Sequence, residues 1–417
     1  MELKRYKLSD VAKVDISSID KKAKENEMTV RLCNFTDVYH NWAITSDMAS
    51  SFMEASANAK EIEKFTIKKG QVAFTKDSET RDDIGIPTYI ADDFENVLLG
   101  YHCALVTPDE TKLCGKYLNA FMHSNYIQKY FELNATGSGM RYTLSIDTLE
   151  GMPLLLPSLE EQKRIGEIFS ALDKKIALNR AINQNLEALA KQLYDYWFVQ
   201  FDFPNEEGKP YKSSGGKMVW NEKIKREIPE NWELLPLFKA SDVQYGFPFA
   251  TEQFTEEITN VPVVRIRDIL EGTTSAYSQE ETDDKYRLKE GDVLVGMDGN
   301  FHMNFWHNNV AYLNQRCVRL RPYDDSTVSS IQILHSIYPY IKAKEKNAKG
   351  STVGHLSDKD LKGLFLIKPI ESAFFHPRKT FDEILALFIE NRKQILSLTK
   401  QRDELLPLLM NGQVTID

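Results

Sequence analysis

Residues 157–198, PSLEEQKRIGEIFSALDKKIALNRAINQNLEALAKQLYDYWF, have the pattern of one long amphipathic helix in the middle of the chain. Its start is marked by a proline and by the Ser158-x-x-Glu161 pattern, which suits a capping box. Asn179 and Asn183 interrupt the apolar stripe, as single polar residues do where the register of a helical pairing is fixed. The stripe recurs every three or four residues and predicts a partner helix; its members are Ile165, Phe169, Leu172, Ile176, Ile182, Leu186, Leu189, Leu193 and Tyr196.

A helix of this length would extend on the order of 60 Å at ~1.5 Å per residue, which is more than one compact domain needs. Such a helix commonly holds two parts of a protein apart. An ordinary amphipathic core helix is the alternative interpretation of this stretch taken alone. The repeat described below favours the helix that separates two domains.

The composition is that of a globular protein. Charged residues make up 27% and hydrophobic residues 42% of the chain. The sequence has neither a run of 18 apolar residues nor the apolar core of a signal peptide, so we expect a cytoplasmic protein without a membrane partner. The four cysteines lack zinc-type spacing, and we expect them to be reduced and mostly buried. A net charge of −9 argues against binding nucleic acid through charge alone, but it leaves room for local basic faces.

The rest of the chain divides around this stretch into a first domain at 1–156, a connector at 199–231, a second domain at 232–370 and a second long helix within 371–417. In the first domain we expect a strand within 65–77, a buried strand within 96–108 and helical structure at 113–135. The connector is rich in Gly, Pro, Ser and charge, and we expect partial order through its aromatic residues Phe201, Phe203, Tyr211 and Trp220.

Four blocks of the first half recur in the same order in the second half, which predicts an internal duplication. The offsets between the blocks drift as insertions in surface loops would make them. In the first pair of blocks we match Arg31 with Arg265 and Asn34 with Asp268. The pairs are RLCNFTDV (31–38) with RIRDILEG (265–272), KKGQVAFTKD (68–77) with KEGDVLVGMD (289–298), GSGMRYTLSIDTLEGMPLLLP (137–157) with GSTVGHLSDKDLKGLFLIKP (350–369), and NQNLEALAKQL (183–193) with KQRDELLPLLM (400–410).

Two striped helices in one chain are natural partners of each other. If they pack antiparallel, the two domains lie at opposite ends of the pair and present two recognition surfaces at a fixed separation. Double-stranded DNA is a plausible ligand because its grooves repeat with each helical turn. We expect the pairing, or the docking of partners, to use Leu172, Ile176, Leu186, Leu193, Trp197, Phe388, Ile395 and Leu405.

Taken together, these blocks and the closing RDELLPLLMNGQV (402–414) resemble the specificity subunit of type I restriction-modification systems, and the resemblance covers essentially the whole chain. It implies an α+β fold in which two pseudo-repeated α/β target recognition domains are separated by two long antiparallel coiled-coil helices. Each domain would read one half of a split DNA target, while the helices set the gap and dock two methyltransferase subunits.

The same resemblance implies that this chain binds no cofactor. Its methyltransferase partners would use S-adenosylmethionine, and restriction subunits would add an ATP- and Mg-dependent translocating nuclease. The residues agree with an adaptor, because the chain has no G-x-x-x-x-G-K-[ST], no Asn-Pro-Pro-Tyr element and no G-x-S-x-G. Two alternatives stay open: a methyltransferase or nuclease with unusual motifs, and a scaffold that pairs with proteins and never touches DNA.

Candidate DNA contacts come from two loops in each domain, because base edges and phosphates are bound by basic, amide and hydroxyl side chains. The loops at 76–83 and 137–143 of the first domain supply Lys76, Ser78, Thr80, Arg81, Ser138, Arg141, Tyr142 and Thr143. The loops at 297–309 and 346–355 of the second domain supply Asn300, His302, Asn304, Asn308, Lys349, Ser351 and Thr352. The alternative for each residue is a solvated turn.

Other conspicuous residues have structural interpretations. For His302 and His307 we expect a neutral packing or hydrogen-bonding role rather than a metal site, since no third ligand is evident. Arg31 and Arg265 suit structural ion pairs. For Arg392 we expect a solvated helix face, with a non-specific contact to DNA phosphates as the alternative. The aromatic segment that begins at Trp197 suits either partner docking or closure against the C-terminal helix.

Overall fold

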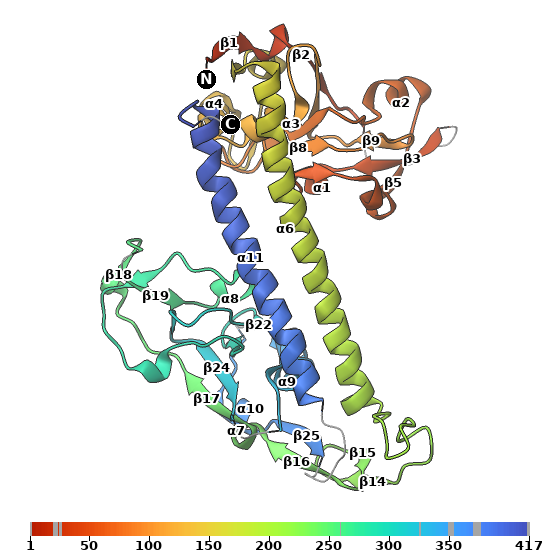
Figure 1. The fold of residues 1–417 in the computed structure, drawn as a ribbon, viewed down its shortest axis with the longest axis vertical. Helices are drawn as coiled ribbons and strands as arrows, with labels where there is room; N and C mark the ends of the chain where they lie inside the picture. The colour runs from red at the N-terminus through yellow and green to blue at the C-terminus, as the bar shows by residue number, and fades with distance from the viewer. Residues whose placement is uncertain are drawn as a thin grey trace. The chain divides into compact units, whose positions relative to one another are not determined.

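The computed structural model describes residues 2–19, 24, 27–258, 260–324, 327–348, 354–369 and 377–414, and they form a mixed α+β fold. The chain divides into two compact units, the first made of residues 1–177 and 396–417 and the second of residues 178–395. The long helices α6 (Leu159–Tyr194) and α11 (Arg378–Met410) each contribute a segment to both units (Figure 1). None of the described helices combines the length and apolar character that a membrane span requires.

The first unit is built on a five-stranded sheet of order β2-β10-β6-β8-β4 and a three-stranded sheet of order β5-β3-β9. Helices α3 and α4 cover the larger sheet through a core that includes Phe74, Tyr117, Phe121 and Phe131. The elements are β1 (Lys4–Lys7), β2 (Ala12–Ile16), β3 (Met28–Cys33), α1 (Phe35–His40), β4 (Ala43–Ile44), β5 (Met53–Ala57), α2 (Ala59–Phe65), β6 (Val72–Thr75), β7 (Asp77–Ser78), β8 (Pro87–Ile90), β9 (Val97–Leu99), β10 (Cys103–Pro108), α3 (Gly115–Met122), α4 (Asn125–Asn134), β11 (Thr136–Ser138), β12 (Arg141–Thr143), α5 (Ile146–Glu150) and β13 (Pro153–Leu156).

The second unit has two four-stranded sheets, of order β17-β24-β21-β22 and β18-β20-β19-β23. Helix α9 packs on the first of these through Ile333, Ile337 and Ile341. The elements are β14 (Met218–Asn221), β15 (Arg226–Pro229), β16 (Trp232–Pro236), α7 (Leu237–Ala240), β17 (Ser241–Tyr245), β18 (Phe254–Thr255), β19 (Val261–Val264), α8 (Asp268–Glu271), β20 (Tyr277–Ser278), β21 (Val293–Gly296), β22 (Met303–Phe305), β23 (Tyr312–Leu313), β24 (Cys317–Pro322), α9 (Ser330–Ala348), α10 (Asp358–Lys362) and β25 (Phe365–Pro369).

Backbone hydrogen bonds confirm the duplication for the second and third sequence blocks. The Leu144 N–H donates to Lys76 O at 2.9 Å, and the Leu356 N–H donates to Met297 O at 2.8 Å. Gly70 and Gly291 open the equivalent strands β6 and β21 with φ of 90° and 82°, a conformation that favours glycine. The fourth pair of blocks lies inside the long helices, where regular hydrogen bonding carries no information about register.

The pairing of the first sequence block was wrong by three residues. Asn34 and Arg265 are the equivalent residues, because each N–H donates to a carboxylate three positions ahead, at 2.7 Å to Asp37 and at 2.8 Å to Asp268. A shift of three residues is close to one helical turn, so the apolar pattern of α1 and α8 fits either alignment. This explains why the sequence pattern did not exclude the wrong match.

The single buried strand expected within residues 96–108 is two strands, β9 and β10, joined by a turn at residues 100–102. His102 ends that turn in the left-handed region, with φ of 72°. The helical segment expected at residues 113–135 is likewise divided, into α3 and α4. Short connections of this kind leave little trace in an apolar pattern.

The long helices pack against each other within each unit. In the second unit they run antiparallel, because Asn179 donates to Gln394 at 3.1 Å while Asn183 donates to the Phe388 carbonyl at 3.3 Å. The buried positions of α6 therefore follow a seven-residue repeat that includes both asparagines. Ile182 and Leu189 were assigned to the same stripe, but they lie beside it and are exposed.

The remaining predicted pairing residues are distributed between the units. Leu172 and Leu405 pack on the core of the first unit, which contains Leu406 and Leu409 of α11. In the second unit, Trp197 and Phe388 belong to one aromatic cluster, which Leu186 and Leu193 cover. Ile176 is buried and Ile395 is half-buried.

The connector is ordered by the same aromatic cluster. Phe201 and Phe203 pack with Trp197 and with Phe381 of α11, so this segment closes against the C-terminal helix as one of the two expectations had it. Trp220 was expected to contribute, but it lies on the β14–β15 hairpin and is 54% exposed.

Candidate nucleic-acid interface

In the first unit the two predicted loops meet in one small sheet. Strands β11, β12 and β7 pair in that order, with Tyr142 opposite Ser78 and Thr143 opposite Asp77. This sheet continues from the end of the buried strand β6. It brings together the segments that carry Lys76, Ser78, Thr80, Arg81, Ser138, Arg141, Tyr142 and Thr143.

The side chains on this sheet differ in their freedom. Lys76 is largely buried and its Nζ lies 2.9 Å from both carboxylate oxygens of Asp77, so its charge is already neutralised. The Arg81 guanidinium lies over the Tyr142 ring at 5.1 Å, an arrangement that leaves its N–H groups available. Arg141 is exposed near the turn between β11 and β12. Among the described residues, Arg81 and Arg141 are therefore the cations of this sheet that form no ion pair.

Asp77 is the electrostatic centre of the site. Burial opposes its ionisation, but hydrogen bonds from Thr143, Lys76 and His102 outweigh this, so the pKa of Asp77 lies below its usual value. The carboxylate is therefore charged at neutral pH, and it joins β7, β12 and the turn before β10.

In the second unit the equivalent carboxylate is Asp298, and its backbone pairs with His355 as that of Asp77 pairs with Thr143. Asp298 forms an isolated antiparallel bridge with His355, and the Gly299 N–H donates to Gly354 O at 3.0 Å. Asn300 and His302 lie just after this bridge in the sequence. The predicted contacts Lys349, Ser351 and Thr352 lie outside the described residues.

The other predicted residues of this loop are held by the protein itself. Asn304 donates to Leu270 O at 3.3 Å, and the Asn308 side-chain oxygen accepts from Trp306 Nε1 and from the Val310 N–H. His307 is buried, as a packing role requires, and burial together with Arg392 and Lys393 lowers its pKa to about 4. Asn304 and Asn308 are thus held by hydrogen bonds within the protein, whereas Asn300 and His302 lie beside the bridge between Asp298 and His355.

Two turns that sequence reasoning missed reach the same carboxylates. His102 Nδ1 lies 2.5 Å from Asp77 Oδ2, and Arg316 Nε lies 3.3 Å from Asp298 Oδ2. Each of these residues directly precedes a cysteine that opens an equivalent strand, β10 or β24. Cys103 and Cys317, at equivalent positions of the two repeats, were the sequence signal that could have led to these turns.

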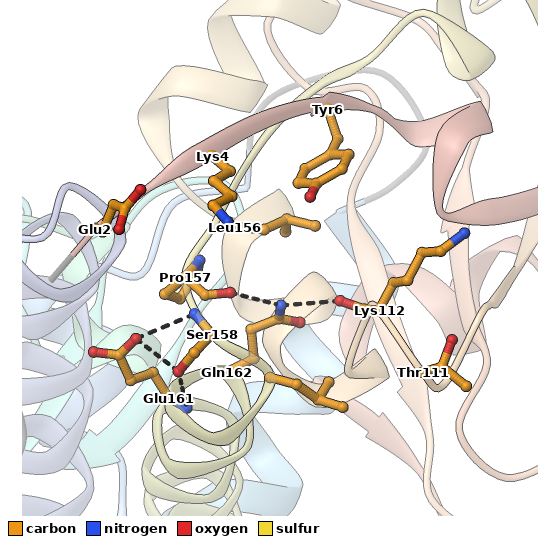
Figure 2. A pocket seen from close by; sticks show the side chains of 11 residues that line it. Glu2, Lys4, Tyr6, Thr111, Lys112, Leu156, Pro157, Ser158, Glu161 and Gln162 are labelled. Atoms are coloured by element: carbon orange, nitrogen blue, oxygen red, sulfur yellow. Dashed lines mark hydrogen bonds between the residues drawn. The ribbon is translucent and has the colours of Figure 1, made fainter.

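A cavity of about 480 Å³ lies beside the start of α6 in the first unit (Figure 2). Its wall includes Gln162, a buried side chain that accepts from the Cys114 N–H at 2.9 Å and donates to Lys112 O and Pro157 O. Ser158 and Glu161 cap the helix as the sequence predicted. With its own capping group in place and acids and bases balanced around it, this helix end is a structural junction.

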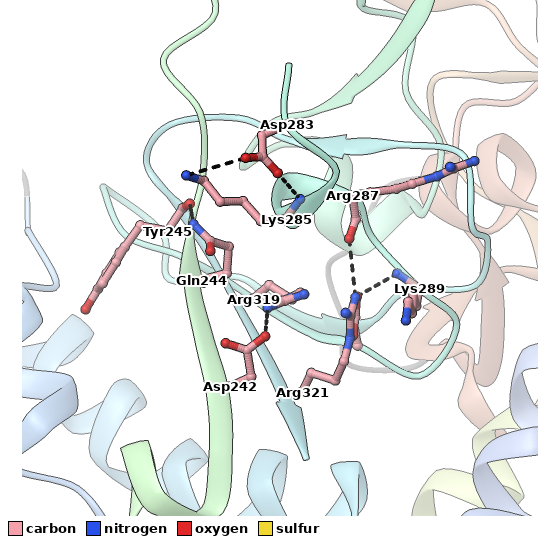
Figure 3. Close-up of polar contacts among 10 residues, drawn as sticks. Asp242, Gln244, Tyr245, Asp283, Lys285, Arg287, Lys289, Arg319 and Arg321 are labelled. Carbon is pink, nitrogen blue, oxygen red and sulfur yellow. Dashed lines mark hydrogen bonds and ion pairs between the residues drawn. The ribbon is translucent and has the colours of Figure 1, made fainter. Parts of the chain in front are cut away.

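Figure 3 shows a group of basic side chains in the second unit, of which Arg319 and Arg321 form ion pairs within the protein. Arg321 makes a bidentate ion pair with the buried Asp292, with distances of 2.6 and 2.7 Å. The equivalent pair in the first unit is neutral, because Gln71 donates to Thr107 at 2.8 Å. Arg319 is buried against Asp242.

Three further arginines were assigned from the sequence. Arg31 pairs with Glu54 at 3.2 Å and Arg265 with Asp268 at 3.5 Å, which confirms the expected ion pairs. The expectation for Arg392 was wrong, because it is buried and donates to Leu270 O at 2.6 Å. A basic residue on a helix surface is indistinguishable in sequence from one that a neighbouring loop covers.

The chain shows similarity to known proteins over most of its length. Residues 2–188 and 229–397 match the family model for the type I restriction modification DNA specificity domain. The MjaIX specificity subunit of Methanocaldococcus jannaschii is 24% identical over 72% of this chain and 69% of its own length. The EcoBI specificity subunit of Escherichia coli is 31% identical over 34% of this chain and 30% of its own length.

A solved structure supports the fold. The type I restriction-modification S subunit from M. genitalium aligns over 100% of this chain and 97% of its own, with a TM-score of 0.59 and 14% sequence identity. The family match occurs twice: residues 2–188 cover most of the first unit, and residues 229–397 cover most of the second. This chain therefore belongs to the family of type I restriction-modification DNA specificity domains.

Proposed function

We propose that this chain is the non-catalytic DNA specificity subunit of a cytoplasmic type I restriction-modification complex. The recognition domains at 1–156 and 232–370 each read one half of a bipartite DNA target. The observation that carries this proposal is the repeated site around Asp77 and Asp298, built from the same backbone hydrogen bonds but different exposed side chains. Equivalent frames with different side chains suit two domains that read different sequences.

The long helices, within 157–198 and 371–417, fix the gap between the half-sites and dock two methyltransferase subunits. Support comes from the face of α6 beside its pairing seam, where Leu178 is 57% exposed and Leu189 is 49% exposed, with Ile182 between them. Apolar residues spaced in this way suit the packing of a partner helix. The methyltransferase partners use S-adenosylmethionine, and restriction subunits use ATP and Mg to translocate and cut DNA.

The test is to co-express the chain with the methyltransferase subunit encoded beside it and to map methylated adenines across the genome by single-molecule sequencing. Two short defined blocks around a fixed undefined gap are the expected result. A continuous motif would mean that one domain alone reads DNA. An active complex that methylates without any motif would replace the proposal with a protein scaffold.

A further inference from the structure

The turns at residues 100–102 and 314–316 share an unusual backbone. Each ends on a non-glycine residue in the left-handed region, with φ of 72° at His102 and 67° at Arg316. Side chains rarely adopt this conformation, and where it persists the surrounding structure imposes it. The two residues occupy equivalent positions, since the Lys76 N–H donates to His102 O and the Met297 N–H donates to Arg316 O. The duplication has kept the same strained turn in both units.

A carboxylate orients each of these side chains. Asp77 contacts His102 at 2.5 Å through Nδ1, and Asp298 contacts Arg316 at 3.3 Å through Nε. The other carboxylate oxygen, Asp298 Oδ1, lies 2.6 Å from His355 Nδ1, and this contact holds the carboxylate in place. The contacts use the inner nitrogen of each side chain and fix its direction.

The outer nitrogens of the two side chains have no hydrogen-bond partner among the described residues. The Arg316 side chain is 60% exposed, and neither Nη atom makes a hydrogen bond within the described part of the chain. The His102 side chain is 37% exposed and packs on the Tyr101 ring with centroids 4.1 Å apart, and its Nε2 makes no hydrogen bond to a described residue. A fixed guanidinium with free N–H groups matches O6 and N7 of guanine, the commonest specific contact in the major groove. An oriented imidazole offers one donor or one acceptor.

The neighbouring residue of each turn is exposed too, and it differs between the units. Tyr101 precedes His102, and Gln315 precedes Arg316. A glutamine side chain can bind adenine through two hydrogen bonds, whereas a tyrosine ring offers an apolar face. The two turns therefore present different chemistry on one repeated frame.

We propose that Arg316 and His102 read bases in the second and first recognition domains, and that Asp298 and Asp77 position them. This inference rests on the proposed function, because it requires each domain to face DNA. It assigns a guanine to Arg316 within the half-site of the second domain. The wild-type complex must show a bipartite motif before the variants are compared.

The experiment is the same methylation map for complexes that carry R316K, R316Q, H102A or D298N. R316K keeps the charge but loses the planar fork, so it should relax discrimination at one base of one half-site by about ten- to a hundredfold. H102A should change only the other half-site. D298N should relax the same base as R316K, because the guanidinium loses its orientation. The control K285A removes an exposed cation of the second unit and should leave the motif intact.

Three results would overturn the inference. One is wild-type stringency at every position in both R316K and R316Q. Another is equal relaxation of both half-sites by R316K, which indicates a phosphate contact without sequence content. The third is loss of all methylation in both Arg316 variants, which indicates a structural role. A wild-type complex without a bipartite motif would instead refute the proposed function itself.

Discussion

Gln162 joins the start of α6 to the first unit, and its replacement by leucine tests how strongly. The side chain is 1% exposed, and its amide makes three hydrogen bonds, to the Cys114 N–H and to the carbonyl groups of Lys112 and Pro157. Leucine has a similar size but leaves all three backbone groups without this partner. Each lost hydrogen bond contributes about 1 kcal/mol, and a buried group left unpaired costs more.

The expected loss in the free energy of unfolding is about 3 kcal/mol, since the added apolar burial of leucine offsets part of the penalty and the adjacent cavity admits water to some of the groups. For a unit of this size this lowers the melting temperature by roughly 6–12 °C. Differential scanning calorimetry of the full chain measures the shift. The matched control is K112A, which alters an exposed side chain and retains the backbone carbonyl. A loss below about 1 kcal/mol for Q162L would refute the reasoning, because the three bonds would then contribute almost nothing.

Three further predictions follow from the same structure. G166A should destabilise the first unit by about 1–2 kcal/mol although alanine favours helices, because its Cβ would lie 2.7 Å from Lys116 Cβ; denaturant unfolding beside K163A as a control measures this. Burial lowers the pKa of His123 to about 3, so as the pH falls the unfolded chain takes up a proton at this histidine before the folded chain does. The free energy of unfolding should therefore be at its full value above about pH 6.5 and about 2 kcal/mol lower at pH 5. H123F should reduce this difference between denaturation curves measured at the two pH values. Inserting seven residues into α6 after Asn183 and seven into α11 before Phe388 preserves the pairing seam. The gap between the two half-sites of the DNA target should then lengthen by about 10 Å, or roughly three base pairs, while both half-sequences stay the same in methylation maps. A changed half-sequence would contradict the role of the helices.

The sequence predicted the architecture well because the architecture is carried by patterns that repeat. The stripe of residues 157–198, the capping box at Ser158 and the duplicated blocks all depend on local spacing. Where spacing is ambiguous the prediction failed: a three-residue shift matched Arg31 with Arg265, and Ile182 was placed on a stripe that Asn183 occupies.

The candidate site was predicted only in part, because its geometry depends on contacts between distant segments. The loops of the first unit were found, since both follow repeated blocks. The turn at His102 was missed because its left-handed residue is neither glycine nor asparagine, and the single Gly100 before it was read as part of one apolar strand. Asn304 and Asn308 suit adenine by chemistry, but the structure uses them to bind Leu270 and Trp306.

The neutral pair Gln71 and Thr107 and the charged pair Asp292 and Arg321 occupy one position in the two repeats. A single exchange at either position is unfavourable. Asp292 beside a threonine would be a buried carboxylate without its counterion, at a cost of several kcal/mol, and arginine beside a glutamine would be a partly buried cation without its own. Recombination between the repeats is constrained in the same way. A crossover that separates β6 from β10, or β21 from β24, should destabilise the hybrid, whereas an exchange of whole repeats keeps each pair intact. An exchange between the two repeats should therefore preserve stability only when whole units, rather than single strands, are exchanged.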